Sequence, residues 1–225
     1  MLPSLIRDIA GGVICSSESF GDRADLDLFP EEEQTLTRAT VDRLHEFRTA
    51  RGCAREALDR LGVMPAAIPV AASRAPVWPP RFVGSITHCR GYRAAAVARE
   101  ADVVAIGIDA EENLPLLEGV DSVVFSSAER AGLARLSGPH AWDRLLFSAK
   151  ESLYKAWFQM TGSPLPYPEV AVRLSSQGSF TVDLSEEARR TVGHEMVCRW
   201  TAERGLLITS VVIPSHPSSG AAIER

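Results

Sequence analysis

The only lysines in the chain are Lys150 and Lys155, although lysine and arginine together number 24. Both lie in the short segment KESLYK. Lysine carries a compact point charge that can approach one phosphate oxygen closely, whereas the planar guanidinium of arginine favours bidentate contacts. Glu151 precedes Lys155 by one helical turn, so the two side chains would be neighbours. Aromatic residues flank Glu151, which favours a pair that lines a cleft over an ordinary exposed ion pair.

A second pair of candidate groups, Asp109 and Glu111, ends the apolar run DVVAIGIDAE. Residues two apart in a strand project from the same face, so both carboxylates would stand side by side where the chain leaves its sheet. Mg²⁺ is held in proteins by one or two carboxylates, with water and phosphate oxygens completing its shell. The pair therefore suggests a magnesium site, and a solvated loop entry is the simpler alternative.

Further groups that could hold phosphate precede these carboxylates. His88 in GSITHC could donate a hydrogen bond to phosphate, or it could be a half-buried strand histidine. An upstream helical segment carries four arginines, Arg43, Arg48, Arg51 and Arg55. Such a stripe is typical of a solvated face paired with carboxylates, but it can also hold a ligand phosphate through bidentate contacts.

Composition restricts the classes of function that these groups could serve. The 225 residues are 45% hydrophobic and 24% charged, as in an ordinary globular protein. The net charge of -5 at pH 7 argues against a general nucleic-acid binder, so any basic site must be local. No apolar run approaches the roughly 20 residues of a membrane span, and the first residues do not resemble a secretory leader. We therefore expect a soluble cytoplasmic protein without membrane contact.

The cysteines suggest the same compartment. Cys15, Cys53, Cys89 and Cys198 have no paired spacing, so neither a zinc site nor a disulfide framework is expected. Reduced and mostly buried thiols are the interpretation that this scatter favours.

Two long helices are predicted to position the candidate groups. The acidic turn at residues 30–33 leads into a helical pattern that continues through residues 41–62. The second helix, residues 141–162, has an apolar stripe that faces a core, formed by Trp142, Leu145, Leu146, Ala149, Leu153, Ala156 and Trp157. A capping-box pattern at residues 126–129 opens a short helix before it. Five prolines make residues 65–80 a long loop.

The predicted strands are residues 82–89, 91–100 and 102–111, with the last two forming a hairpin that turns near residues 100–102. Residues 195–203 and 206–213 form a second hairpin, and residues 216–225 form a flexible tail. Each half of the chain thus contains a long helix, a proline-bearing connection and a hairpin. This order predicts an α+β fold of two similar halves, residues 1–110 and 111–215, with a ligand cleft between them.

The segments GSITHC, GIDAE and FSAKESLYKAW, in this order and at these intervals, resemble the signature of Sfp-type phosphopantetheinyl transferases, in particular the enterobactin synthase component D-like branch. Upstream, RLHEFRTARGCAREAL and an AP-x-WP element resemble the same branch, so the likeness covers about residues 29–157. It implies two pseudo-twofold-related α/β halves, each with a long helix packed on a small antiparallel sheet. Because one chain would hold both halves, we expect a monomer.

The resemblance also implies an activity. Such enzymes transfer the 4'-phosphopantetheine arm of coenzyme A to a serine of an apo acyl or peptidyl carrier protein, with Mg²⁺, and release adenosine 3',5'-bisphosphate. Polyketide and nonribosomal peptide carriers are among the candidate partners. A metal-dependent phosphodiesterase acting on coenzyme A and a non-catalytic carrier-protein binding module remain the alternatives.

Roles for the site residues follow from the same resemblance. Asp109, Glu111 and Glu151 are the implied metal ligands, and Glu151 is also the candidate base for the carrier serine. Lys155 would neutralise charge on the pyrophosphate, and Lys150 would assist or orient it.

Other matching positions are implied to hold coenzyme A. His88, also a catalytic candidate, and Thr87 beside it match the position that hydrogen-bonds a coenzyme A phosphate. Arg43 and Arg51 match the positions that hold the adenosine phosphate end, and Arg74 is a further candidate.

Two positions leave questions open. Some relatives carry an acidic group where this chain has Ala110, so a third ligand would be Glu151 or water. Carrier contacts are expected in residues 113–136, where Val123, Val124 and Phe125 could meet a carrier helix or could be ordinary core.

Overall fold

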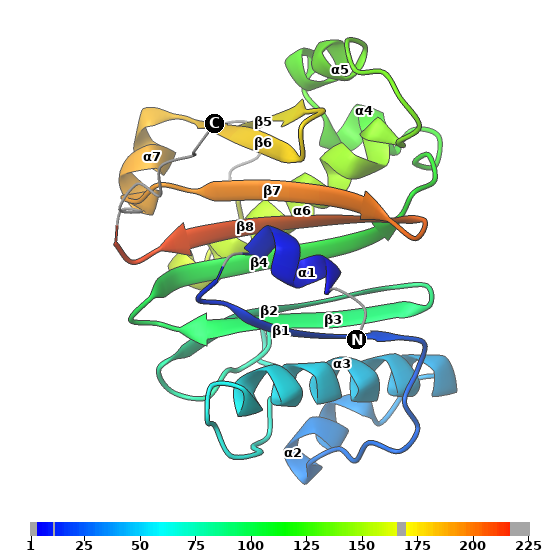
Figure 1. Ribbon diagram of the computed structural model, residues 1–225, viewed down its shortest axis with the longest axis vertical. Coiled ribbons are helices and arrows are strands. Elements are labelled where there is room, and N and C mark those ends of the chain that lie inside the picture. Colours follow the sequence, from blue (N-terminus) through cyan, green and yellow to red (C-terminus); the bar gives the residue numbers. More distant parts are fainter. Residues whose placement is uncertain (1–3, 11, 166–169, 217–225) are drawn as a thin grey trace.

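The computed structural model describes residues 4–10, 12–165 and 170–216, which form two antiparallel sheets and their covering helices (Figure 1). The first sheet has the order β1-β3-β2 and the second has the order β4-β8-β7-β6-β5. The strands are β1 (Cys15–Phe20), β2 (Phe82–Cys89), β3 (Tyr92–Arg99), β4 (Val103–Glu112), β5 (Val170–Ser175), β6 (Ser179–Leu184), β7 (Val197–Glu203) and β8 (Leu206–Pro214). The architecture is the expected α+β fold.

One long helix packs on each sheet, as predicted. Helix α3 (Val41–Asp59) covers the first sheet and begins at Thr40, whose side chain accepts a hydrogen bond from the amide of Arg43. Helix α6 (Trp142–Thr161) covers the second sheet and ends at Gly162, which adopts the left-handed conformation. The shorter helices are α1 (Leu5–Ala10), α2 (Pro30–Glu33), the 3₁₀ helix η1 (Gln34–Leu36), α4 (Val120–Val124), α5 (Ser127–Leu133) and α7 (Glu186–Val192).

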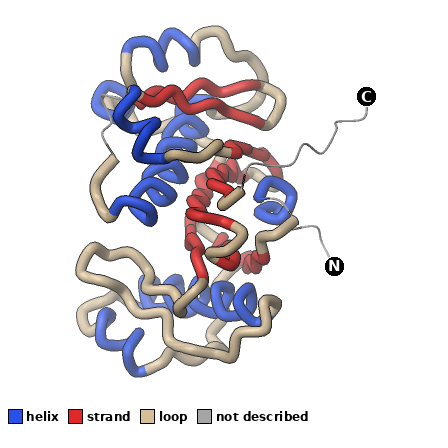
Figure 2. The backbone as a smooth tube through the Cα atoms, turned by 90° about the vertical axis from the view of Figure 1, so that its left-hand side faces the viewer, coloured by secondary structure: helices blue, strands red, loops and turns tan. Residues whose placement is uncertain are grey.

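Strand β3 shows how one strand serves two cores. Ala95 and Val97 pack beneath α3, whereas Ala94 and Ala96 face a core on the other side of the sheet. That second core joins β3 to β4, β8 and α1, so it is shared by both sheets. Figures 1 and 2 place α1 on the face opposite α6. The two sheets are thus joined by one continuous apolar core on the face that α1 covers.

The apolar stripe predicted for residues 141–162 is confirmed. Its members are all buried in the core beneath α6. The capping box before α5 is confirmed too, because Ser126 and Glu129 exchange hydrogen bonds with each other's backbone amides. Among the described residues, no helix is long and apolar enough to cross a membrane. All four cysteines are free thiols.

One predicted hairpin is wrong. Strands β3 and β4 do not pair, because β3 lies between β1 and β2 while β4 pairs with β8. The chain does turn between Arg99 and Val103, but there it passes from one sheet to the other. The passage from the first sheet to the second therefore falls at this turn, and β4 belongs to the second sheet. The hairpin of β7 and β8 is confirmed. Most of the predicted tail, residues 217–225, lies outside the described residues.

Candidate active site

Helix α6 lies unusually close to β4, and Gly107 makes this approach possible. A Cβ atom at Gly107 would come within 1.7 Å of the carbonyl oxygen of Ser152. Any side chain there would push the helix away from the strand. Strand alternation places Asp109 and Glu111 on the same face as Gly107, toward α6. The close approach therefore brings these carboxylates to the helix turn that carries Glu151 and Lys155.

Lys155 joins α6 to the end of β4. Its Nζ donates to Asp109 Oδ1 at 2.7 Å and to the carbonyl oxygen of Ile108 at 2.9 Å. Asp109 is only 7% exposed, and its second oxygen, Oδ2, is buried without a hydrogen-bond partner among the described residues. A buried carboxylate oxygen without a partner is costly, so this atom is suited to receive a cation or a donor.

The neighbouring carboxylates respond to Asp109. Burial, reinforced by the charge of Asp109, raises the pKa of Glu111 above its ordinary value, although Arg144 opposes the shift. Burial and then Asp109 likewise raise the pKa of Glu151, against the effect of Lys155. Added positive charge would relieve both carboxylates. In the part of the chain that the structure describes, however, no three His, Cys, Asp or Glu side chains are already gathered as a metal cluster.

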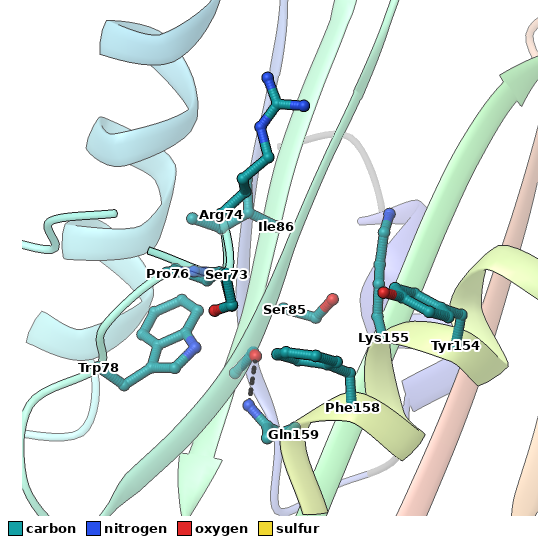
Figure 3. A pocket seen from close by; sticks show the side chains of 12 residues that line it. Ser73, Arg74, Pro76, Trp78, Ser85, Ile86, Tyr154, Lys155, Phe158 and Gln159 are labelled. Carbon is teal, nitrogen blue, oxygen red and sulfur yellow. Dashed lines mark hydrogen bonds between the residues drawn. The ribbon is translucent and has the colours of Figure 1, made fainter. Parts of the chain in front are cut away.

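A cavity of about 540 Å³ opens beside Lys155 (Figure 3). Tyr154, Lys155 and Phe158 line it from α6, and the rings of Tyr154 and Phe158 are stacked. Arg74 and Trp78 line it from the proline-rich loop. The cavity thus offers an apolar slot with a cation on either side.

A second cavity, of about 570 Å³, continues from the first along β2. The two share Arg74, Pro76 and Ile86 as lining residues. Basic groups gather in the second cavity, which is lined by Arg38, Arg43, Arg51, Arg74 and His88. This confirms the expectation that a basic site in this acidic chain is local.

The arginines of this cavity are held in different ways. Arg51 lies over the ring of Phe47 and donates from Nε to the carbonyl oxygen of Ile68. Burial lowers the pKa of Arg51 to about 10, so the guanidinium stays charged at neutral pH. Arg74 has a φ of 71°, a left-handed conformation that is uncommon for a residue with a side chain. Arg55, by contrast, pairs with the buried Glu32.

Two predicted site residues are turned away from the cavities. Thr87 Oγ1 accepts a hydrogen bond from the amide of Ala110 and donates to Asp109 Oδ1, so it positions the carboxylate rather than a ligand. Lys150 is 2% exposed and donates to both carboxylate oxygens of Glu129, so it lies against α5, and its assignment as a coenzyme A contact stays a prediction. Its position on α6 is rotated by about 140° from that of Lys155.

For the apolar residues after β4, the sequence left two interpretations open, contact with a carrier helix or ordinary core, and the structure divides the residues between them. Phe125 is buried in the core and Val124 packs against it. Val123 is 86% exposed, and Leu117 is similarly exposed. Only Val123 of the three predicted candidates is therefore available on the surface.

Several residues of the site escaped the sequence interpretation. Ser85 Oγ accepts a hydrogen bond from the amide of Ile108, and Gln159 joins the carbonyl oxygen of Gly84 to the amide of Ile106. These side chains connect the edges of β2 and β4 without a backbone ladder. The alternation of Ser85 and Thr87 in GSITHC is the available signal. Arg144, which pairs with Glu111 at 3.1 Å, had no local signal.

Comparison with known protein families agrees with this arrangement. The model described as the 4'-phosphopantetheinyl transferase N-terminal domain matches residues 31–98, and that of the 4'-phosphopantetheinyl transferase superfamily matches residues 105–207. The boundary between the two matches coincides with the passage from the first sheet to the second.

Curated relatives give the same answer over most of the chain. The 4'-phosphopantetheinyl transferase Svp of Streptomyces mobaraensis is 47% identical over 195 residues, which cover 83% of this chain and 78% of Svp. PptT of Mycobacterium tuberculosis, also a 4'-phosphopantetheinyl transferase, is 38% identical over 88% of this chain and 91% of its own. Enterobactin synthase component D of Salmonella typhi is 33% identical over 59% of this chain and 56% of its own. The chain therefore belongs to the 4'-phosphopantetheinyl transferase family and is an enzyme that transfers the phosphopantetheine arm to carrier proteins.

Proposed function

We propose that the two connected cavities bind coenzyme A and that its 4'-phosphopantetheine group passes to a serine of an apo acyl or peptidyl carrier protein. The observation that carries this assignment is the position of Lys155. Its ammonium is bonded to Oδ1 of Asp109, whose Oδ2 has no partner among the described residues, and it lines a cavity that continues to a cluster of basic side chains. A dinucleotide-like ligand with phosphates at two places would match these two ends.

The carboxylates beside Lys155 fit a magnesium ion. They are hard oxygen donors, and Asp109 Oδ2 is buried and lacks a partner among the described residues. Asp109, Glu111 and Glu151 would hold the ion, with water and phosphate oxygens of the ligand completing its shell. When bound, Mg²⁺ would supply positive charge to the pyrophosphate as its bridging P–O bond breaks.

Glu151 is the proposed base. It is half-buried on the turn of α6 that also carries Lys155, and burial, then Asp109, raise its pKa, a shift that a bound cation would oppose. It takes the proton of the carrier serine as the Oγ–P bond forms. The P–O bond to the nucleotide breaks in the same displacement, and adenosine 3',5'-bisphosphate leaves.

Lys155 and the basic cavity hold the donor. The Lys155 ammonium faces both Asp109 and the cavity, so it can neutralise charge on the pyrophosphate without leaving its place. Arg43, Arg51 and His88 line the second cavity, where they are proposed to bind the phosphate of the adenosine end. Arg74 borders both cavities and could contact either group.

The carrier protein is proposed to dock on the segment between β4 and α5. Leu114, Leu117 and Val123 are exposed there, and the carbonyl oxygens of Leu114 and Pro115 are held by Arg144, which also holds Glu111. A carrier at this surface would present its serine on the carboxylate side of the site.

Four finer assignments complete the proposal. The motif order favours the enterobactin synthase component D-like branch, and polyketide or nonribosomal peptide carriers are proposed as partners. A single chain supplies both walls of the cleft, which supports a monomer. Four free thiols are in keeping with a reducing cytoplasm.

An intact-mass assay tests the function. The purified protein is incubated with coenzyme A, Mg²⁺ and an apo carrier domain, beside reactions without metal and with the carrier serine changed to alanine. We expect one phosphopantetheine arm on the carrier, absent from both controls. Metal-dependent loss of coenzyme A without a carrier adduct would instead indicate a phosphodiesterase. No change in carrier or coenzyme A would leave only a binding role.

A further inference from the structure

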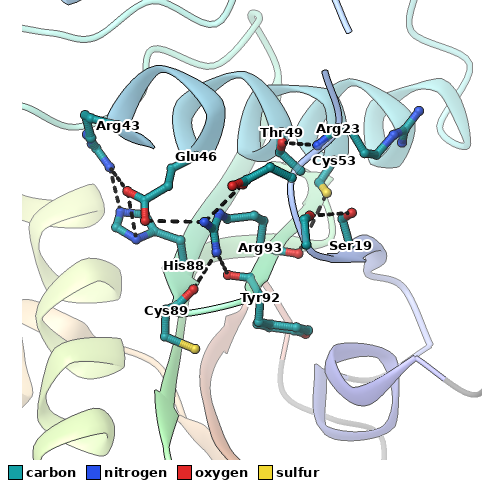
Figure 4. Close-up of polar contacts among 12 residues, drawn as sticks. Ser19, Arg23, Arg43, Glu46, Thr49, Cys53, His88, Cys89, Tyr92 and Arg93 are labelled. Carbon is teal, nitrogen blue, oxygen red and sulfur yellow. Dashed lines mark hydrogen bonds and ion pairs between the residues drawn. The ribbon is translucent and has the colours of Figure 1, made fainter. Parts of the chain in front are cut away.

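A chain of charged side chains runs from the interior of the first sheet to the basic cavity (Figure 4). It begins at Arg93 on β3, which is only 5% exposed and donates to the carbonyl oxygen of Tyr92. The guanidinium pairs with Asp22 at 3.0 Å and with Glu46 Oε1 at 3.3 Å. A buried cation that is fixed from several sides holds its carboxylate partner in one place.

This series of charged side chains ends at Arg43 and His88, which both line the cavity. Glu46 Oε2 lies 3.4 Å from Arg43 and 4.0 Å from Nδ1 of His88. The Arg43 guanidinium donates to Nε2 of His88 at 2.9 Å. Glu46 is therefore the point at which the buried Arg93 meets both members of the proposed phosphate-binding pair.

The location of Glu46 beside a proposed anion site has to be explained, because the negative charge of its carboxylate repels an anionic ligand. The geometry at His88 gives one. Arginine has no hydrogen-bond acceptor, so Nε2 of His88 must accept from Arg43, and the ring proton is then on Nδ1, toward Glu46. A phosphate that binds at the Arg43 side of the ring would need a donor at Nε2, so the ring would gain a proton there when this ligand binds.

The groups that face His88 differ in how they affect that proton. Burial, and then the charge of Arg43, lowers the pKa of His88, and Lys155 on α6 and Arg93 on β3 act in the same direction. Glu46 on α3 is the group among them that raises the pKa. The carboxylate thus stabilises the charged ring that a phosphate requires.

We propose that Glu46 is a positioning residue for coenzyme A. Anchored by Arg93, Glu46 orients Arg43 and His88 toward the cavity. It also stabilises the His88 ring with a proton on both nitrogens, the form that can donate a hydrogen bond to the phosphate from Nε2. Glu46 itself does not touch the ligand. The inference rests on the proposed binding of coenzyme A in this cleft, and it adds a residue that the motif resemblance did not assign.

The matched pair Glu46→Gln and Asp42→Asn tests the inference. Both remove one negative charge from α3 at nearly constant size, and Asp42 is an exposed residue one turn before Glu46. Long-range electrostatics alone predicts that either change strengthens anion binding. If Glu46 positions Arg43 and His88, Glu46→Gln should instead weaken the binding of the anion.

The measurement is calorimetric titration with coenzyme A at pH 7, repeated in two buffers of different ionisation enthalpy to count protons taken up. We expect Glu46→Gln to weaken binding about tenfold, as for loss of one charge-assisted contact, and to reduce proton uptake. Asp42→Asn should match the wild type in both. Melting temperatures for all three proteins check the fold.

Two outcomes would overturn different statements. If Glu46→Gln binds coenzyme A as tightly as Asp42→Asn, or takes up as many protons as the wild type, Glu46 has no positioning role. If the wild type itself does not bind coenzyme A, the proposed function fails instead. A Glu46→Asp variant that restores proton uptake but not full affinity would support the inference further, because the charge is kept and the reach is shortened.

Discussion

At the scale of single side chains, Asp109 connects the strand to the helix. Oδ1 is held by Lys155 and Thr87, while Oδ2 is buried and has no partner among the described residues. The carboxylate is therefore fixed by its first oxygen and available at its second. This division lets the residue be preorganised for a cation without being neutralised by the protein.

Glu151→Gln should abolish transfer while the fold is kept. The amide has the same shape but cannot take the serine proton, so we expect a fall in kcat of about 100-fold or more. Intact-mass kinetics at saturating Mg²⁺, with Glu112→Gln as the control on the opposite face of β4, measures it. Normal turnover would remove Glu151 from the mechanism.

Lys155→Ala should lower turnover more than affinity for coenzyme A. The ammonium meets charge that grows as the P–O bond breaks, so its loss should reduce kcat about 100-fold. The KM for coenzyme A should change much less, because the basic cavity still holds the nucleotide end. A variant with unchanged kcat and a raised KM would assign Lys155 to ground-state binding instead.

At the scale of elements, Lys150 and Glu129 fasten α5 to α6 and to β5. The Glu129 side chain is 1% exposed, and it accepts hydrogen bonds from Lys150 and from the amides of Ser126 and Val172. Burial alone would raise the pKa of Glu129, but these donors together hold it below its ordinary value. The pair fixes α5, which directly follows the proposed carrier surface.

Glu129→Gln should destabilise the protein at pH 7, because it leaves the Lys150 ammonium buried without its charge partner. We expect a loss of about 3 kcal/mol in the free energy of unfolding. A group with a lowered folded pKa stabilises above its unfolded pKa, here about 4.5, and this stability is lost as the pH falls through the folded value. The difference between variant and wild type should therefore shrink below pH about 4.5.

Urea unfolding at a series of pH values measures this difference. A gap that stays constant down to pH 4 would show that the glutamate charge is not what the variant removes. Transfer by the folded variant should persist at pH 7, since neither residue lines the cavities beside Lys155.

At the scale of the whole molecule, the two sheets meet edge to edge without a ladder of backbone hydrogen bonds. Side chains of Ser85, Thr87 and Gln159 satisfy the amides at alternate positions of β4 instead. The shared core around α1 holds the other side together. The cavities lie beside this seam, so the geometry of the site depends on how the halves are joined.

Ser85→Ala and Thr87→Val compare two side chains of the seam, of which Ser85 also lines the cavity beside Lys155 and Thr87 also touches Asp109. Each leaves one β4 amide unpartnered, so each should lower the free energy of unfolding by about 1–3 kcal/mol. Only Thr87 also contacts Asp109, so Thr87→Val should have the larger loss of kcat. Thermal melts and transfer kinetics on both variants measure the contrast. Equal losses of kcat would mean that the contact of Thr87 with Asp109 adds nothing to turnover.

Local rules account for much of this arrangement. Strand alternation predicts that Asp109 and Glu111 share a face, and helical periodicity places Glu151 and Lys155 on one side of α6. Both placements follow from the regular backbone geometry of a strand or a helix, which is set within a few neighbouring residues. The motif order then indicates the family, and the comparisons with known relatives agree with it.

The tertiary structure alone decided the partners. Lys150 and Lys155 look equivalent in KESLYK, yet one is buried against Glu129 and the other meets Asp109. Strand β4 joins β8, about 100 residues further along the chain, rather than its neighbour β3. Such choices depend on which surfaces bury the most apolar area and satisfy the most polar groups once the whole chain is packed. This balance of apolar burial and hydrogen bonding is a property of the whole folded molecule, so it cannot be predicted from a short segment of the sequence.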